Sequence, residues 1–115
     1  MIVNLIADAG STKTDWVITD SKGEGITSFN TNGVNALLCP PGSIAAIASQ
    51  VWSKLTSGDM EVNALHYYGA GCATPQICQR CEAELGQAIH AKEIRVNSDL
   101  LGAARSLLQR ESWRT

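Results

Sequence analysis

The chain has 115 residues, which is enough for one compact domain and too few for two. Its 9 Lys and Arg against 11 Asp and Glu give a net charge of −2 with no basic block, which argues against a nucleic-acid or anionic-membrane partner. Hydrophobic residues make up 44% and charged residues 17%, a globular composition that excludes general disorder.

The amino-terminal residues do not have the pattern of a targeting signal. The apolar run 1–7 follows no charged segment, is too short for a signal peptide or a membrane span, and stops at Asp8. We therefore expect a cytoplasmic protein. Its four cysteines, at positions 39, 72, 78 and 81, would then be reduced thiols rather than a disulfide framework.

The first third of the chain has the pattern of three strands. Residues 2–7 are almost all apolar, which is typical of a buried strand. A second apolar stretch includes 16–18, and the run 20–25 that follows is dense in turn-forming residues. This pattern predicts a hairpin whose second arm, the third strand, reaches about residue 31.

Strands and helices alternate in the remainder. After the Pro-Pro-Gly run at 40–42, Ser43 can cap a helix with apolar residues at helical spacing as far as Leu55. Residues 62–68 are apolar and aromatic enough for a central strand, which ends at the Gly-Ala-Gly run 69–71.

A second helix is predicted from Thr74 as the cap and Pro75 at the first helical position. Its apolar stripe consists of Ile77, Cys81, Leu85 and Ala88. A short strand at 94–96 and a third helix, from Ser98 or Asp99 to Leu108, complete the order βββαβαβα. This order predicts an α/β fold with a mixed five-stranded sheet and helices on its faces.

The segment 8–14 is the most informative part of the sequence, with a D-x-G-x-T-x-T arrangement directly after the first strand. Small residues let backbone N–H groups approach an anion closely, and the hydroxyls of Thr12 and Thr14 can add donors. A carboxylate such as Asp8 suits Mg²⁺, usually through bound water. The pattern indicates a nucleotide-phosphate site, but an ordinary polar hairpin with Asp8 capping the turn would also explain it.

Four motifs in this order resemble those of the BadF/BadG/BcrA/BcrD-type ATPases, and more closely the N-acetylglucosamine-kinase-like branch of that family. They are Leu5–Trp16, Thr31–Asn35, Tyr68–Cys72 and Asn97–Arg105. The resemblance extends over nearly the whole chain. It implies the ribonuclease-H-like fold of the amino-terminal domain in the actin, hexokinase and sugar-kinase superfamily, and it implies ATP and Mg²⁺ as cofactors.

The resemblance also implies roles for individual residues. Asp8 would lie near Mg²⁺, the backbone of Gly10, Ser11, Thr12 and Lys13 would face the β- and γ-phosphates, and Thr14 would belong to the same phosphate-binding loop. Asn35 would hold a sugar hydroxyl, and Gly71 would border the cleft. Asp99 would take the proton from the hydroxyl that accepts the phosphoryl group.

Each of these residues has a structural alternative. Asp99 follows Ser98 immediately before an apolar stretch, where such a pair commonly caps a helix. Asn35 is also typical of a turn, and the run 69–71 could simply be a tight connection between strand and helix. Cys78 and Cys81 have the C-x₂-C spacing of a metal or redox site, but no second ligand pair accompanies them, so we interpret them as buried thiols.

Kinases of this family have a second domain, with another phosphate loop and the adenosine pocket, that this sequence lacks. We therefore hypothesise a truncated or frame-shifted amino-terminal half of an amino-sugar kinase, inactive or incomplete by itself. The alternative is a non-catalytic domain that forms a homodimer or pairs with a separate chain.

Overall fold

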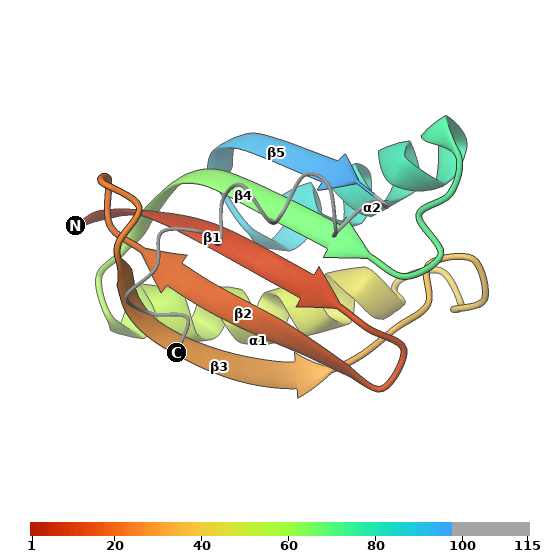
Figure 1. The fold of residues 1–115 in the computed structure, drawn as a ribbon, viewed down its shortest axis with the longest axis horizontal. Coiled ribbons are helices and arrows are strands. Elements are labelled where there is room, and N and C mark those ends of the chain that lie inside the picture. Colours follow the sequence, from red (N-terminus) through yellow and green to blue (C-terminus); the bar gives the residue numbers. More distant parts are fainter. Residues whose placement is uncertain (98–115) are drawn as a thin grey trace.

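The computed structural model describes residues 1–97, which form a mixed five-stranded sheet with two helices (Figure 1). The strands are β1 (Ile2–Ala9), β2 (Lys13–Thr19), β3 (Gly25–Asn32), β4 (Glu61–Gly69) and β5 (Ala91–Asn97). The helices are α1 (Ser43–Ser57) and α2 (Pro75–Ala88). The expected five strands and the first two helices are confirmed, whereas the predicted third helix lies outside the described residues. Neither α1 nor α2 is long and apolar enough to span a bilayer, and these are the helices within residues 1–97.

The strands lie in the order β3-β2-β1-β4-β5. The hairpin pairs β1–β2 and β2–β3 are antiparallel, while β1–β4 and β4–β5 are parallel. Consequently β1, β3, β4 and β5 all run in one direction, and their carboxyl ends lie at the same edge of the sheet. The turn between β1 and β2 lies at that edge too, at the right of Figure 1.

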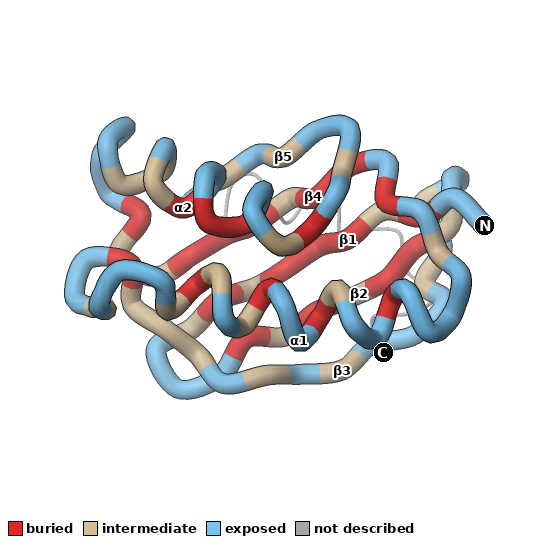
Figure 2. The backbone as a smooth tube through the Cα atoms, turned by 180° about the vertical axis from the view of Figure 1, so that it is seen from behind, coloured by how far each residue is buried: buried red, intermediate tan, exposed pale blue. Residues whose placement is uncertain are grey.

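Both described helices cover the same face of the sheet and contact each other (Figures 1 and 2). The two crossover connections, from β3 to β4 and from β4 to β5, advance in the same direction across the sheet. Because such crossovers are right-handed, both place their helix on the same side.

The hydrophobic core lies between this helix pair and the sheet, where Figure 2 shows buried residues along β1 and β4. Trp16 on β2 is fully buried, its ring centroid lies 6.2 Å from that of Tyr67, and its indole N–H donates to the hydroxyl of Thr31. The predicted stripe of α2 faces this core, with Cys81 and Leu85 fully buried.

The two helices begin differently. Thr74 caps α2 as predicted, because its hydroxyl accepts a hydrogen bond from the amide of Ile77 at 3.2 Å. Ser43 does not cap α1: it is the first helical residue, and its hydroxyl donates to the carbonyl of Pro40. The prediction of a Ser43 cap was wrong because a carboxylate from α2, described below, takes that role.

Candidate functional site

Three turns that are far apart in the sequence meet at the carboxyl edge of the sheet. They are residues 10–13 between β1 and β2, residues 33–39 after β3, and residues 69–72 after β4, all at the right of Figure 1. Backbone hydrogen bonds join them: the Ala70 amide donates to Ala9, and the Ala36 amide donates to Ala70. The structure therefore brings together the residues predicted at positions 10–13, 35 and 71.

The first turn is narrow and presents free backbone donors. It is closed by a hydrogen bond of 2.9 Å from the Gly10 amide to the Lys13 carbonyl. Ser11 and Thr12 are exposed, and their amides have no acceptor within residues 1–97. The ammonium of Lys13, also exposed, lies 3.7 Å from the Asp15 carboxylate. Two unpaired amides and a neighbouring cation can bind an anion at this position.

Gly33 holds the second turn directly against the first. Its amide donates to the Thr12 carbonyl at 3.1 Å. A Cβ atom at position 33 would overlap the Gly10 carbonyl oxygen and the Lys13 amide nitrogen, and would lie 2.7 Å from the Thr12 carbonyl carbon. Only glycine permits this approach. Gly33 is part of the motif Thr31–Asn35, but the sequence did not reveal this reason for it.

Asn35 and Gly71 form the contact between the second and third turns. The Asn35 side-chain oxygen accepts a hydrogen bond from the Leu37 amide at 3.0 Å. Asn35 therefore stabilises the turn, which was the structural alternative to a role in sugar binding. Its side-chain nitrogen has no acceptor in the described chain. Gly71 has φ +82°, and a Cβ atom there would overlap the Asn35 side-chain oxygen. Both residues therefore shape the edge of the site.

Arg80 and Glu84 on α2 hold the second turn in place through hydrogen bonds and an ion pair, and the sequence analysis did not identify either residue. The Arg80 guanidinium donates to the carbonyls of Ala36, Cys39 and Pro40, and it pairs with the Glu84 carboxylate at 3.1 Å. One Glu84 oxygen also accepts hydrogen bonds from the amides of two residues at the start of α1, Ile44 and Ala45. Their spacing of four residues on a predicted helix was the one sequence signal that could have indicated this ion pair.

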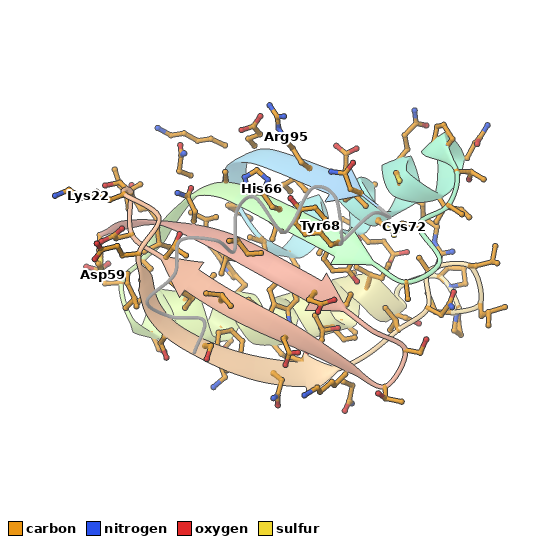
Figure 3. All side chains as sticks on the ribbon, in the orientation of Figure 1. Lys22, Asp59, His66, Tyr68, Cys72 and Arg95 are labelled. Carbon is orange, nitrogen blue, oxygen red and sulfur yellow. The ribbon has the colours of Figure 1, made fainter. Side chains whose placement is uncertain are left out.

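Asp8 lies near the end of β1 on the sheet face away from the two helices. Its neighbours in register are Asp15 on β2 and Tyr68 on β4, and Figure 3 shows Tyr68 on that face. Burial raises the pKa of Asp8, the Asp15 carboxylate raises it further, and Lys13 partly offsets both. Two carboxylates this close would be stabilised by a cation between or beside them.

Two predicted site residues are placed differently or not described. The Thr14 hydroxyl is buried and has no hydrogen-bond partner among residues 1–97, because its side chain points toward the helix-covered face. This position does not support the predicted contact of Thr14 with a phosphate. Asp99, the predicted base, lies outside the described residues.

Two cavities in the described chain lie away from the three turns. One of about 380 Å³ is at the opposite edge of the sheet, lined by residues that include Ile2, Trp52 and His90. Another of about 380 Å³ includes Asn4 and His66 on the face away from the helices. Neither cavity is lined by residues of the first turn.

The cysteines gather near the third turn. Cys72 and Cys81 are buried, and Cys39 and Cys78 are partly exposed. No group of three Cys, His, Asp or Glu side chains within residues 1–97 is placed to hold a metal ion.

Comparison with known proteins gave structural matches only. No family model and no curated protein matches the chain. A protein of Porphyromonas gingivalis, provisionally assigned as an N-acetylglucosamine kinase, is 36% identical with a TM-score of 0.64; the match covers 92% of this chain and 37% of that protein. The ethanolamine utilization protein EutJ of Carboxydothermus hydrogenoformans is 12% identical with a TM-score of 0.56, covering 83% of this chain and 36% of that one.

These matches show the class of fold. The sheet order and the helix pair are those of the amino-terminal half of the sugar-kinase and actin-like fold, so the expected ribonuclease-H-like architecture is confirmed. The chain spans little more than a third of the length of either neighbour.

Proposed function

We propose that the chain is the phosphate-binding amino-terminal half of an ATP-dependent kinase that phosphorylates an amino sugar of the N-acetylglucosamine type. The observation that carries the proposal is the first turn, with two unpaired exposed amides at the carboxyl edge of the sheet. The 36% identity to the Porphyromonas gingivalis protein, over 92% of this chain, supports the choice of substrate class.

In this proposal the chain binds the β- and γ-phosphates through backbone N–H groups of the first turn. The amides of Ser11 and Thr12 donate to phosphate oxygens, and the Lys13 ammonium contributes positive charge. Gly33 keeps the turn in shape because it leaves no side chain between the two segments. Little other chemistry is required of a protein in phosphoryl transfer, since positioning and charge neutralisation dominate.

Asp8 is the residue that would hold Mg²⁺, directly or through water. The carboxylate pair of Asp8 and Asp15 fits a divalent cation, because the Asp15 charge raises the pKa of Asp8 and a bound cation would remove that effect. Mg²⁺ bound there would neutralise charge on the transferred phosphoryl group.

Asn35 and Gly71 form the sugar side of the proposed site. With its oxygen committed to the Leu37 amide, Asn35 retains two N–H donors for a sugar hydroxyl. The close packing of Gly71 fixes the position of Asn35. Asp99 is proposed as the base that accepts the hydroxyl proton, two residues beyond the end of β5.

Calorimetric titration of the full chain with Mg·ATP tests the proposal. Binding should occur and should weaken about tenfold in Asp8→Asn, the loss expected for one charge-assisted interaction. Asp59→Asn is the matched control, since Asp59 lies at the opposite edge of the sheet (Figure 3), and it should bind as the parent does. Absence of binding in the parent chain, together with a homodimer in light scattering, would favour the non-catalytic alternative.

The sugar part of the proposal is tested separately by saturation-transfer NMR with N-acetylglucosamine and Mg·ATP. Asn35→Asp keeps the oxygen that the Leu37 amide requires and removes the side-chain N–H donors. The sugar signal should disappear in this variant while Mg·ATP affinity is unchanged. A sugar signal that persists in Asn35→Asp would exclude Asn35 as a ligand.

A further inference from the structure

Cys72 and Cys81 meet in the interior between the end of β4 and helix α2. Their sulfur atoms are 3.6 Å apart, and the residues are 2% and 0% exposed. Figure 3 shows Cys72 at the turn that leaves β4. They are nine positions apart in the sequence, Cys72 in the turn after β4 and Cys81 on α2, so their contact is a product of the fold.

The surroundings confine the Cys72 sulfur beside Cys81. A Cβ atom at Gly69 would lie 2.8 Å from the Cys72 sulfur and 2.7 Å from the Tyr67 ring, so the missing side chain of Gly69 leaves the space that this sulfur fills. The other two thiols are engaged elsewhere. The Cys78 sulfur lies 3.7 Å from the Cys72 carbonyl oxygen, and the Cys39 sulfur lies 3.2 Å from the Arg80 guanidinium.

We propose that Cys72 and Cys81 are a dithiol that a hydroperoxide oxidises to an intramolecular disulfide. A disulfide needs the sulfurs about 1.5 Å closer than they are here. Cys72 is in a turn rather than in a strand or helix, so its side chain and backbone can supply this displacement while Cys81 stays on α2.

The reaction is balanced with hydrogen peroxide as the oxidant. The Cys72 thiolate attacks one peroxide oxygen, the O–O bond breaks, and Cys72 becomes a sulfenic acid with release of one water. The Cys81 sulfur then attacks the Cys72 sulfur, loses its proton and displaces the second water. Two thiols and one peroxide give one disulfide and two waters, and the two electrons lost by the sulfurs reduce the peroxide.

The two thiols differ in their position in the fold and in the direction of their pKa shifts. Either thiol can donate in the hydrogen bond between Cys72 and Cys81, and when Cys72 accepts, this bond lowers the pKa of Cys72 although burial opposes the shift. The same hydrogen bond, together with burial, raises the pKa of Cys81. Cys72, in the turn after β4, is assigned as the thiolate that meets the peroxide, and Cys81, on α2, as the resolving thiol.

The disulfide would fasten the third turn to α2. That turn carries Gly71 against Asn35, and Arg80, next to Cys81, already holds the carbonyls of the second turn. Oxidation would thus fix two of the three turns at the carboxyl edge to one helix. This inference concerns thiol chemistry and holds whether or not the proposed kinase function is correct.

Tryptic mapping of the full chain after hydrogen peroxide treatment and alkylation of the remaining thiols tests the proposal. Trypsin cuts after Lys54, Arg80 and Lys92, so Cys72 and Cys78 fall in peptide 55–80 and Cys81 falls in peptide 81–92. We expect these two peptides to be linked, with the mass of the pair reduced by two hydrogens, and to separate with dithiothreitol.

Variants identify the partner within peptide 55–80. The link should remain in Cys78→Ser and in the control Cys39→Ser, and should be lost in both Cys72→Ser and Cys72→Ala. Cys72→Ala is included because Cys72→Ser places a hydroxyl in a buried position and could destabilise the fold. The proposal is overturned if peroxide leaves the two peptides unlinked in the parent chain, or if the link survives removal of Cys72 and requires Cys78.

Discussion

The Glu84 carboxylate joins the start of α1 to α2 across 40 residues of sequence, and Glu84→Ala is expected to destabilise the fold strongly. One of its oxygens accepts hydrogen bonds from the amides of Ile44 at 3.0 Å and Ala45 at 3.1 Å. These amides have no acceptor within the helix, as is general for the first turn. The side chain of Glu84 is 9% exposed, so water cannot readily replace it.

The magnitude follows from these two hydrogen bonds. A hydrogen bond to a charged acceptor contributes about 1.5 kcal/mol at the lower end of the measured range, so the pair contributes about 3 kcal/mol. This is a large share of the roughly 5–15 kcal/mol that stabilises a typical domain. At about 4 °C per kcal/mol for a domain of this size, the midpoint of thermal unfolding should fall by about 12 °C.

Urea and thermal unfolding followed by circular dichroism measure this change. Glu82→Ala is the matched control, because Glu82 is exposed on the same helix, and it should change the unfolding free energy by less than about 0.5 kcal/mol. Glu84→Gln keeps an acceptor without the charge and should cost about half as much as Glu84→Ala. Equal stability of the Glu84→Ala and Glu82→Ala chains would refute the assigned capping role.

Three further predictions concern pH, a glycine pair and a buried hydroxyl. Burial acts to raise the pKa of Glu84, but hydrogen bonds from the Ala45 amide and Arg80 outweigh it, so the pKa is lowered. The contribution of the Glu84 carboxylate to stability is therefore present above the ordinary pKa of about 4.3 and is lost as the pH falls below it. In urea unfolding at several pH values, the parent chain should lose more stability in acid than Glu84→Gln does. In the same assay, Gly71→Ala should lower the free energy of unfolding by about 1 kcal/mol or more beyond the effect of Gly42→Ala. Both glycines have positive φ, but only a Cβ atom at position 71 meets other atoms, so equal effects would contradict the packing described. Thr14→Val should leave Mg·ATP affinity unchanged and the free energy of unfolding equal or up to about 1 kcal/mol higher, because the buried hydroxyl has no partner in the described part of the chain; calorimetry showing weakened binding would return Thr14 to the phosphate site.

Local patterns were sufficient to predict the five strands and two helices of residues 1–97. The apolar run of β1 and the Thr-Pro start of α2 each depend on neighbouring residues, and both are confirmed. The start of α1 depended on a residue 40 positions away, so the local pattern at Ser43 pointed to the wrong cap. Capping by a side chain of another helix cannot be seen in the sequence around the helix start.

For the candidate site too, local sequence indicated where the turns lie but not the contacts between them. Glycines and small residues identified the three turns, but the reasons for Gly33 and Gly71 are contacts between turns, which only the fold provides. Thr14 was predicted at the phosphate from its hydroxyl, whereas alternation along β2 directs its side chain into the core. The contact between Cys72 and Cys81 also required the packing of α2 on the sheet, since the C-x₂-C spacing drew attention to Cys78 instead.

The amide resonances of the first turn provide the most direct test of the proposed phosphate site. In ¹H–¹⁵N NMR spectra of the full chain titrated with Mg·ATP, we expect the largest shifts at Gly10, Ser11, Thr12 and Lys13, with smaller ones at Gly33 through its hydrogen bond to Thr12. Saturating nucleotide that leaves these amides unmoved, or that shifts residues at the opposite edge of the sheet instead, would contradict the account.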